Sequence, residues 1–140
     1  MYARDFEGLF KDVMKQVCLL PSDILFVENI AAWCKEQGIP EHDEQRPLKL
    51  VSKNGSGCRM LIREDIPEEA VDERINALWV RSQLKNNVFD RADLLNSENK
   101  KLAYLLLNEY ATSLPEINDD ELAADEWVFG QMDRMGFFRT

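Results

Sequence analysis

The segment LKLVSKNGSGCRMLIR, residues 48–63, decides the predicted fold because this stretch has the pattern of a β-hairpin. Two alternating runs, 48–53 and 58–63, flank a turn that contains two glycines, which is a strong hairpin signal. A two-residue loop would mix apolar and basic side chains on both faces. A loop with an odd number of residues pairs Leu50 with Met60 and Leu48 with Ile62, and this register separates them. We therefore predict the odd loop.

In this register the hairpin has an apolar face and a basic face. The apolar face carries Leu48, Leu50, Cys58, Met60 and Ile62. The basic face carries Lys49, Lys53, Arg59 and Arg63, together with Val51 and Leu61. An isolated two-stranded hairpin is marginally stable, so we expect it to pack on helices or to pair its edge with another chain. The four cations fit a solvated cover of an exposed strand, pairing with an acidic helix, or an anionic ligand.

The rest of the sequence predicts helices. Apolar periodicity, proline stops and capping residues place five principal helices at 3–20, 23–37, 65–87, 97–112 and 118–136, with a short helix at 90–95. Ser22, Ser97 and Asn118 are the expected N-caps, and Gly38 and Gly136 the expected C-terminal glycines. The predicted fold is mostly α: one helical domain, residues 1–140, in which a five-helix bundle carries the inserted hairpin.

The loop and the acidic pairs offer little chemistry. The single histidine, His42, lies beside Asp43 and Glu44 in a proline-bounded linker, 39–47, and no second nitrogen or thiolate ligand accompanies it. The pairs Glu41/Glu44 and Glu69/Asp72 resemble the magnesium-binding pattern of all-helical nucleotide pyrophosphohydrolases. Neither a phosphate-binding glycine loop nor a nucleophile motif is present. We predict no catalytic residue, no metal site and no cofactor.

The charge distribution points to a protein partner. The net charge is −9, yet residues 41–63 carry 5 basic and 3 acidic residues. This balance disfavours direct nucleic-acid binding, which needs clustered cations. Glu121 and Asp125 are four residues apart and predict either a solvated face or a docking surface for a basic patch.

Apolar side chains exceed what one helical seam requires. The residues in excess are Trp33, Val80, Leu84, Phe129 and Phe138. They fit either a multilayer core or an interface with another chain, where aromatic residues are favoured.

The cysteines and the first residues indicate a compartment. Cys18, Cys34 and Cys58 are odd in number and form no CxxC pair, which is typical of reduced, buried thiols. Acidic residues stand where a signal peptide needs a basic head, and no apolar run is long enough for a membrane span. We expect a cytoplasmic protein.

Two functions remain open. The first is a non-enzymatic interaction or regulatory module, expected to be a homodimer, that uses acidic and apolar helical surfaces. An inhibitor that imitates nucleic acid is a special case of it. The alternative is a small metal-dependent nucleotide-processing enzyme or an anionic-ligand binder. The candidate binding residues are Lys49, Lys53, Arg59, Arg63, Glu121, Asp125, Phe129 and Phe138.

Overall fold

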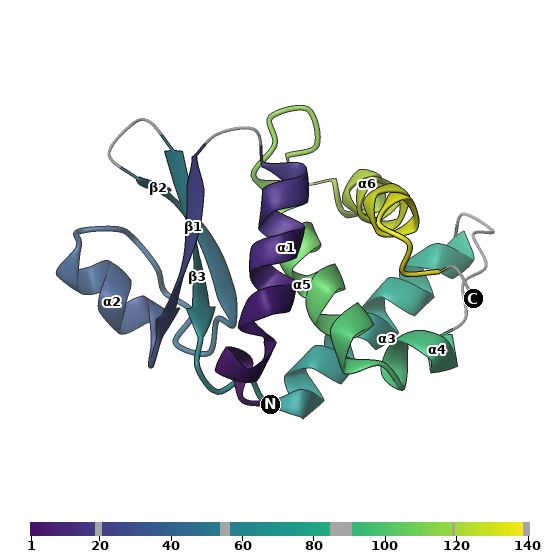
Figure 1. Cartoon of the computed structure of the whole chain (residues 1–140), viewed down its shortest axis with the longest axis horizontal. Coiled ribbons are helices and arrows are strands. Elements are labelled where there is room, and N and C mark those ends of the chain that lie inside the picture. The colour runs from purple at the N-terminus through teal and green to yellow at the C-terminus, as the bar shows by residue number, and fades with distance from the viewer. Residues whose placement is uncertain (19–20, 54–56, 85–90, 119, 139–140) are drawn as a thin grey trace. The chain divides into compact units, whose positions relative to one another are not determined.

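The computed structural model describes residues 1–18, 21–53, 57–84, 91–118 and 120–138 and divides the chain into two compact units (Figure 1). Unit 1 is Met1–Ile66 and unit 2 is Pro67–Thr140. The structure is mostly helical with a small three-stranded sheet, which is an α+β composition. The expected mostly helical chain is thus confirmed. The five-helix bundle is not, because two of the helices flank the sheet in unit 1.

Unit 1 is built on the sheet. It begins with a 3-10 turn, Ala3–Phe6, and helix α1, Glu7–Val17, which lie within the helix predicted at 3–20. Helix α1 ends earlier than predicted, because Cys18 is already extended. Strand β1, Ser22–Val27, helix α2, Ile30–Glu36, and strands β2, Leu48–Lys53, and β3, Gly57–Arg63, follow. The strand order is β1-β3-β2, with β3 parallel to β1 and antiparallel to β2.

The hairpin has the predicted register. Leu48 pairs with Ile62 and Leu50 pairs with Met60, so the odd loop is confirmed. Its turn, residues 54–56, lies outside the described residues. The hairpin is not two-stranded, however, because β1 occupies the other edge of β3. That pairing supports the hairpin together with the helices, on which we expected it to pack.

Strand β1 corrects the predicted helix at 23–37. Only the second half, α2, is helical; Ser22 begins a strand, and Asn29 caps α2 by accepting a hydrogen bond from the Ala32 amide. The four apolar residues 24–27 form a short continuous run, which suits a strand buried on both faces as well as a helix. The partner strand β3 decides between them.

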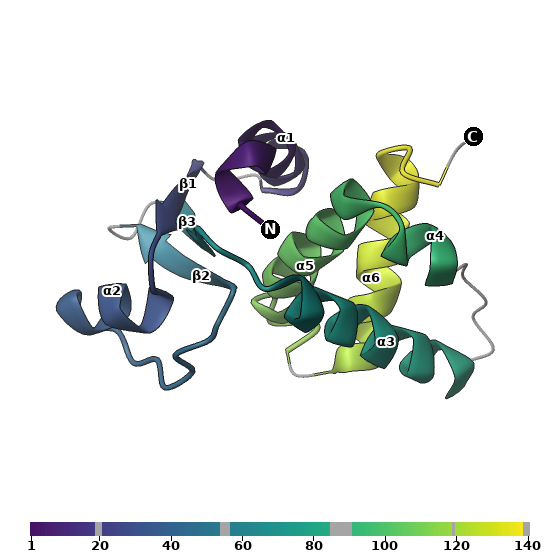
Figure 2. The same ribbon diagram turned by 90° about the horizontal axis from the view of Figure 1, so that it is seen from below.

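The sheet is covered on both faces by unit 1 itself. Helix α1 contacts β1 and α2 contacts β3, and Figure 2 shows these helices on opposite sides of the sheet. On the α1 side, the Phe10 and Phe26 rings lie 6.4 Å apart between centroids. On the α2 side, a buried cluster joins helix and strands: Val27, Ile30, Cys34, Val51 and Leu61, with Leu25, Trp33 and Ile39 packed against it. Part of the face that we expected to be basic is therefore core.

Unit 2 is helical throughout its described elements. It contains α3, Glu68–Leu84; α4, Arg91–Leu95; α5, Glu98–Thr112; and α6, Glu121–Arg134. Helix α5 is central, since its residues 101–107 are all buried, as its apolar run predicts. Residues 85–90, where we expected the end of the third helix and the start of the short helix at 90–95, lie outside the described residues.

The helix ends test the predicted caps. The Ser97 side chain accepts from the Lys100 amide, which confirms it as the cap of α5. Asp120, not Asn118, caps α6 by accepting from the amides of Leu122 and Ala123. Gly136 has φ +89° and the Phe137 amide donates to the Met132 carbonyl at 3.0 Å, so the predicted closure is confirmed. None of the helices described here has the length and apolar character needed to cross a membrane.

Candidate functional site

The basic face of the hairpin is paired within unit 1. Arg59 donates to both carboxylate oxygens of Asp23, at 2.8 and 3.0 Å, and Lys53 donates to the same carboxylate at 2.8 Å. These bonds, Arg59 first, hold the pKa of Asp23 at about 2, below its ordinary value of 3.8, although partial burial opposes the shift. Strand β1, missed by the sequence analysis, supplies this carboxylate.

The other two hairpin cations lie near the linker that precedes β2. Lys49 and Arg46 contact Glu41 at 3.3 and 3.2 Å, and the Glu41 side chain is 7% exposed. Arg63 donates to the side chain of Gln45 at 3.1 Å. Three of the four predicted cations thus meet carboxylates of their own unit, which favours a structural role for the basic face over an anion site.

Asp125 belongs to a polar cluster inside unit 2. Arg81 donates to its two carboxylate oxygens at 2.7 and 3.2 Å, and the Tyr104 hydroxyl donates to it at 3.0 Å. The cluster joins α3, α5 and α6. Burial, with the neighbouring carboxylate, raises the pKa of Tyr104, while hydrogen bonding to Asp125 raises the pKa of Arg81. Asp125 is buried here, so it ties helices together rather than facing solvent.

A buried lysine forms a second polar cluster in unit 2. Lys101 is fully enclosed on α5, and its ammonium lies 2.9 Å from Asp72 and 3.7 Å from Glu68 on α3. The sequence analysis missed Arg81, Tyr104 and Lys101. A signal existed, because Lys101 directly precedes the apolar run of α5 and Asp125 lies among the buried residues of α6. A charged residue on a buried stripe indicates an internal ion pair.

The remaining predicted residues lie at the surface of unit 2. Glu121 is exposed and lies 3.8 Å from Arg81. The rings of Phe129 and Phe138 are 5.8 Å apart, both half-buried, and the Lys100 ammonium lies 5.9 Å from the Phe138 ring. Among the other apolar residues in excess, Trp33 packs against the unit 1 cluster and Val80 is 59% exposed. The Leu84 side chain is outside the description.

Exposed acids dominate the surface of unit 2. By sequence, residues 67–140 carry 15 acidic and 8 basic residues, whereas residues 1–66 carry 11 and 9. Among the described residues of unit 2, three basic side chains are exposed: Arg74, Arg91 and Arg134. Ten acidic side chains are exposed: Glu68, Glu69, Glu73, Asp93, Glu98, Glu116, Asp120, Glu121, Glu126 and Asp133. We call these ten residues the acidic surface.

The acids considered for a metal have cations or solvent as neighbours. Glu41 is held by Arg46 and Lys49, and Asp72 is held by Lys101. His42 is exposed and lines an open pocket of about 650 Å³ at the end of α2. Within the part of the chain that the structure describes, no group of three His, Cys, Asp or Glu residues is arranged to hold a metal ion.

Comparisons with known proteins do not extend this description, since no protein-family model, curated protein or solved structure matches the chain.

Proposed function

We propose that this protein is a non-enzymatic interaction module and that the acidic surface of unit 2 binds a basic protein partner. The observation that carries the proposal is the imbalance of exposed charge on that unit, ten acidic against three basic side chains among its described residues. A surface of one sign attracts a partner of the opposite sign, accelerates its association and suppresses partners of like charge.

Ion pairs hold three cations of unit 2 against its own carboxylates. Lys101 is buried against Asp72, and Arg81 lies against Asp125. Lys100 contacts Asp93 on the neighbouring helix α4 at 2.5 Å. Each such pair takes one cation and one carboxylate together, so the excess of acids over cations in unit 2 is unchanged and remains at its surface.

Helix α3 offers the acidic surface an apolar neighbour. Glu69, Glu73 and Val80 are exposed and recur at spacings of four and seven residues, which places them on one side of the helix. A partner that matches this side has basic residues and one apolar contact, as an amphipathic basic helix does. We therefore propose a basic helical segment of another protein as the binding element.

Three further proposals go with this function. The protein acts in the cytoplasm, and it contacts proteins rather than nucleic acid. In a special case, the acidic surface occupies the nucleic-acid site of a DNA-binding protein. The module is a homodimer, and β2 suits this because it is an edge strand with exposed Ser52 and Lys53.

Fluorescence anisotropy tests the acidic surface. The probe is a labelled amphipathic helical peptide of lysine and leucine, titrated with the intact chain at several salt concentrations. Glu69→Gln/Glu73→Gln removes two exposed charges and should weaken binding about fivefold, from roughly 1 kcal/mol of lost attraction. The matched control, Glu28→Gln/Glu36→Gln, removes two exposed acids from unit 1 and should leave binding unchanged. Equal effects of both pairs, or binding insensitive to salt, would contradict the proposal.

Two more measurements separate the accompanying proposals. Displacement of a fluorescent DNA duplex from a linker histone supports the nucleic-acid-mimicking case, and histone binding without displacement contradicts it. Light scattering should give a mass near twice 16.3 kDa. A strict monomer at tens of micromolar would exclude the dimer. That result would not bear on the acidic surface, which the anisotropy titration tests separately.

A further inference from the structure

Two cysteines from distant parts of the sequence meet in unit 1. The Sγ atoms of Cys18 and Cys58 lie 3.3 Å apart, although the residues are 40 positions apart, and both are reduced and partly buried. Cys18 ends α1, and Cys58 is the second residue of β3. A covalent S–S bond is about 2.05 Å long, so the sulfurs must approach by roughly 1.2 Å to form one. Side-chain rotation covers a displacement of that size.

Backbone contacts fix Cys58 in this position. Its amide donates to the Pro21 carbonyl at 3.0 Å, and β3 pairs in parallel with β1, where Cys58 is opposite Ser22. The preceding residue, Gly57, permits this approach, since a Cβ there would lie 2.3 Å from the Pro21 oxygen. The chain thus brings β3 against the segment that follows Cys18, and the two thiols meet as a consequence.

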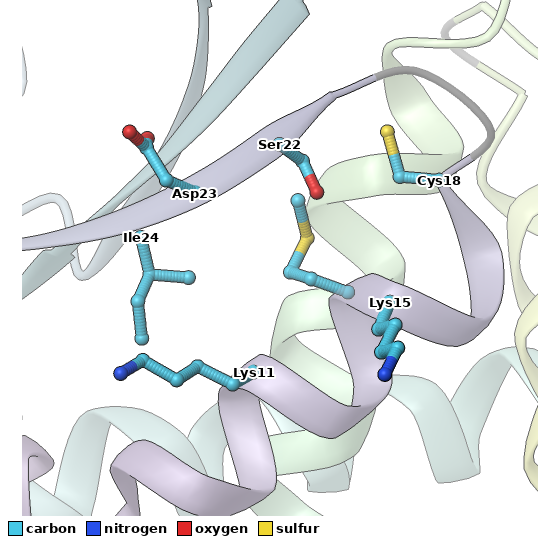
Figure 3. Close-up of a pocket in the computed structure, with 7 residues that line it drawn as sticks. Lys11, Lys15, Cys18, Ser22, Asp23 and Ile24 are labelled. Carbon is cyan, nitrogen blue, oxygen red and sulfur yellow. The ribbon is translucent and has the colours of Figure 1, made fainter.

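Cys18 also borders a pocket that a small molecule can enter. The pocket, of about 570 Å³, lies between α1 and β1 (Figure 3). Figure 3 shows Ser22 and Ile24 pointing toward α1, while the Asp23 carboxylate points to the other side of the strand. Lys11 and Lys15 extend from α1 and line the same pocket, with Lys11 below Ile24 and the Lys15 ammonium pointing away from the Cys18 sulfur. The pocket is therefore lined by one thiol and two cationic side chains.

We propose that Cys18 and Cys58 form a dithiol site, which a low-molecular-weight disulfide bearing carboxylates oxidises to an intramolecular disulfide after it enters this pocket. Cys18 is the attacking residue because it borders the pocket. Cys58 is the resolving residue. Burial raises the pKa of the Cys58 thiol to about 12, and its contact with Cys18 adds to the increase, so Cys58 itself is a poor first nucleophile.

The exchange balances without another oxidant. The Cys18 thiolate attacks one sulfur of the small disulfide, which forms a mixed disulfide and releases one small thiolate. Cys58 then loses its proton to solvent, and its sulfur attacks Cys18 Sγ and expels the second small thiolate. Two protein thiols are oxidised, and one small disulfide is reduced to two thiols.

Mass spectrometry of the intact chain tests the dithiol site. The protein is incubated with oxidised glutathione, the remaining thiols are alkylated in denaturant, and the peptides are mapped. We expect a peptide that links Cys18 to Cys58, formed at least about tenfold faster than any change at Cys34, which is fully buried. If the two cysteines are merely packed together, the linking peptide does not form and both thiols remain free to be alkylated. The proposal is overturned if both are fully alkylated under conditions that oxidise the denatured chain.

Variants assign the two roles. Cys58→Ser should stop at a stable mixed disulfide on Cys18, and Cys18→Ser should leave Cys58 unmodified. A wild-type chain that stops at the mixed disulfide would also overturn the proposal, and this readout needs no variant to fold. Reversal of the roles, with Cys58 trapped first, contradicts the assignment of Cys18 as the attacking thiol.

A charge test examines the pocket as the route of entry. Oxidised glutathione carries carboxylates, whereas cystamine is a cationic disulfide. Lys11→Gln/Lys15→Gln should slow the glutathione reaction roughly two- to fivefold and should not slow the cystamine reaction. The control Lys35→Gln changes an exposed lysine on α2, across the sheet, and should alter neither rate. Equal slowing of both reagents would exclude the pocket cations from the site.

Discussion

The two partners of the ion pair at the buried Lys101 should differ in how much their replacement changes the free energy of unfolding. Its side chain is 2% exposed, while that of Asp72 is 41% exposed and that of Glu68 is 60% exposed. Removal of the lysine leaves two carboxylates that water can still solvate. Removal of Asp72 leaves an ammonium inside unit 2, and Glu68, at 3.7 Å, is the carboxylate that the described residues still place near it. Removal of the lysine should therefore preserve or raise the free energy of unfolding, whereas removal of Asp72 should lower it.

The magnitudes follow from the cost of burying charge. Lys101→Met keeps a long apolar chain and removes the buried ammonium, so the free energy of unfolding should stay constant or rise by about 1 kcal/mol. Asp72→Ala breaks a buried pair, which typically costs about 3–5 kcal/mol. Glu68 retains part of the attraction and Asp72 is partly exposed, so we expect a loss of about 2–3 kcal/mol.

Urea unfolding measures the difference. The midpoint should fall for Asp72→Ala and should hold or rise for Lys101→Met, with an unchanged dependence on urea concentration. Glu73→Ala is the matched control, because it removes the next acid on α3 from an exposed position and should change stability by less than about 0.5 kcal/mol. If Lys101→Met cost as much as Asp72→Ala, the ammonium would be a net stabilising group and this reasoning would be refuted.

Other predictions concern single contacts. Asp125→Asn weakens the charged bonds to Arg81 and should lower the unfolding free energy by about 2–3 kcal/mol in urea titrations; an unchanged midpoint would contradict the role of this cluster. The lowered pKa of Asp23 stabilises the fold above pH 3.8, and this contribution should be lost as the pH falls toward about 2. Since Asp23 is partly exposed, we expect about 1 kcal/mol at most, and Asp23→Asn should abolish that part of the pH dependence. Gly57→Ala should cost about 1–3 kcal/mol in the same unfolding assay through the clash with Pro21, whereas the control Gly130→Ala, with open space around it, should raise stability by about 0.5–1 kcal/mol.

The elements predicted correctly from the sequence are those with local signals. The hairpin register depends on which neighbouring residues share a face, and this can be read from alternation alone. The cap Ser97, the glycine closure at Gly136 and the buried run of α5 are likewise set within one turn of helix. Each signal involves residues that are close in the sequence.

The errors arose where distant segments decide the structure. Residues 24–27 fit a helix or a buried strand equally well, and their pairing with β3, more than thirty residues later, selects the strand. The same long-range pairing brings Asp23 to Arg59. Two cations of a face that looks unpaired in the sequence, Lys53 and Arg59, thus meet a carboxylate on a strand that local patterns could not place.

The sequence predicted the acidic character of the candidate site but not where on the protein the acidic residues lie. Net charge identified an acidic protein, and the structure assigns the imbalance to one unit. Pairing removes equal numbers of positive and negative charges, so it leaves unit 1 close to balance and unit 2 with its acidic excess at the surface. In unit 1 the carboxylates of Asp23 and Glu41 form ion pairs with cations of the hairpin. In unit 2 Arg81 pairs with the buried Asp125 and Lys101 pairs with the partly exposed Asp72. Three basic side chains then face ten acidic ones among the described exposed residues of that unit. Substitutions on the acidic surface should therefore change association with a basic partner, whereas substitutions at Asp125 or Lys101 should change folding first.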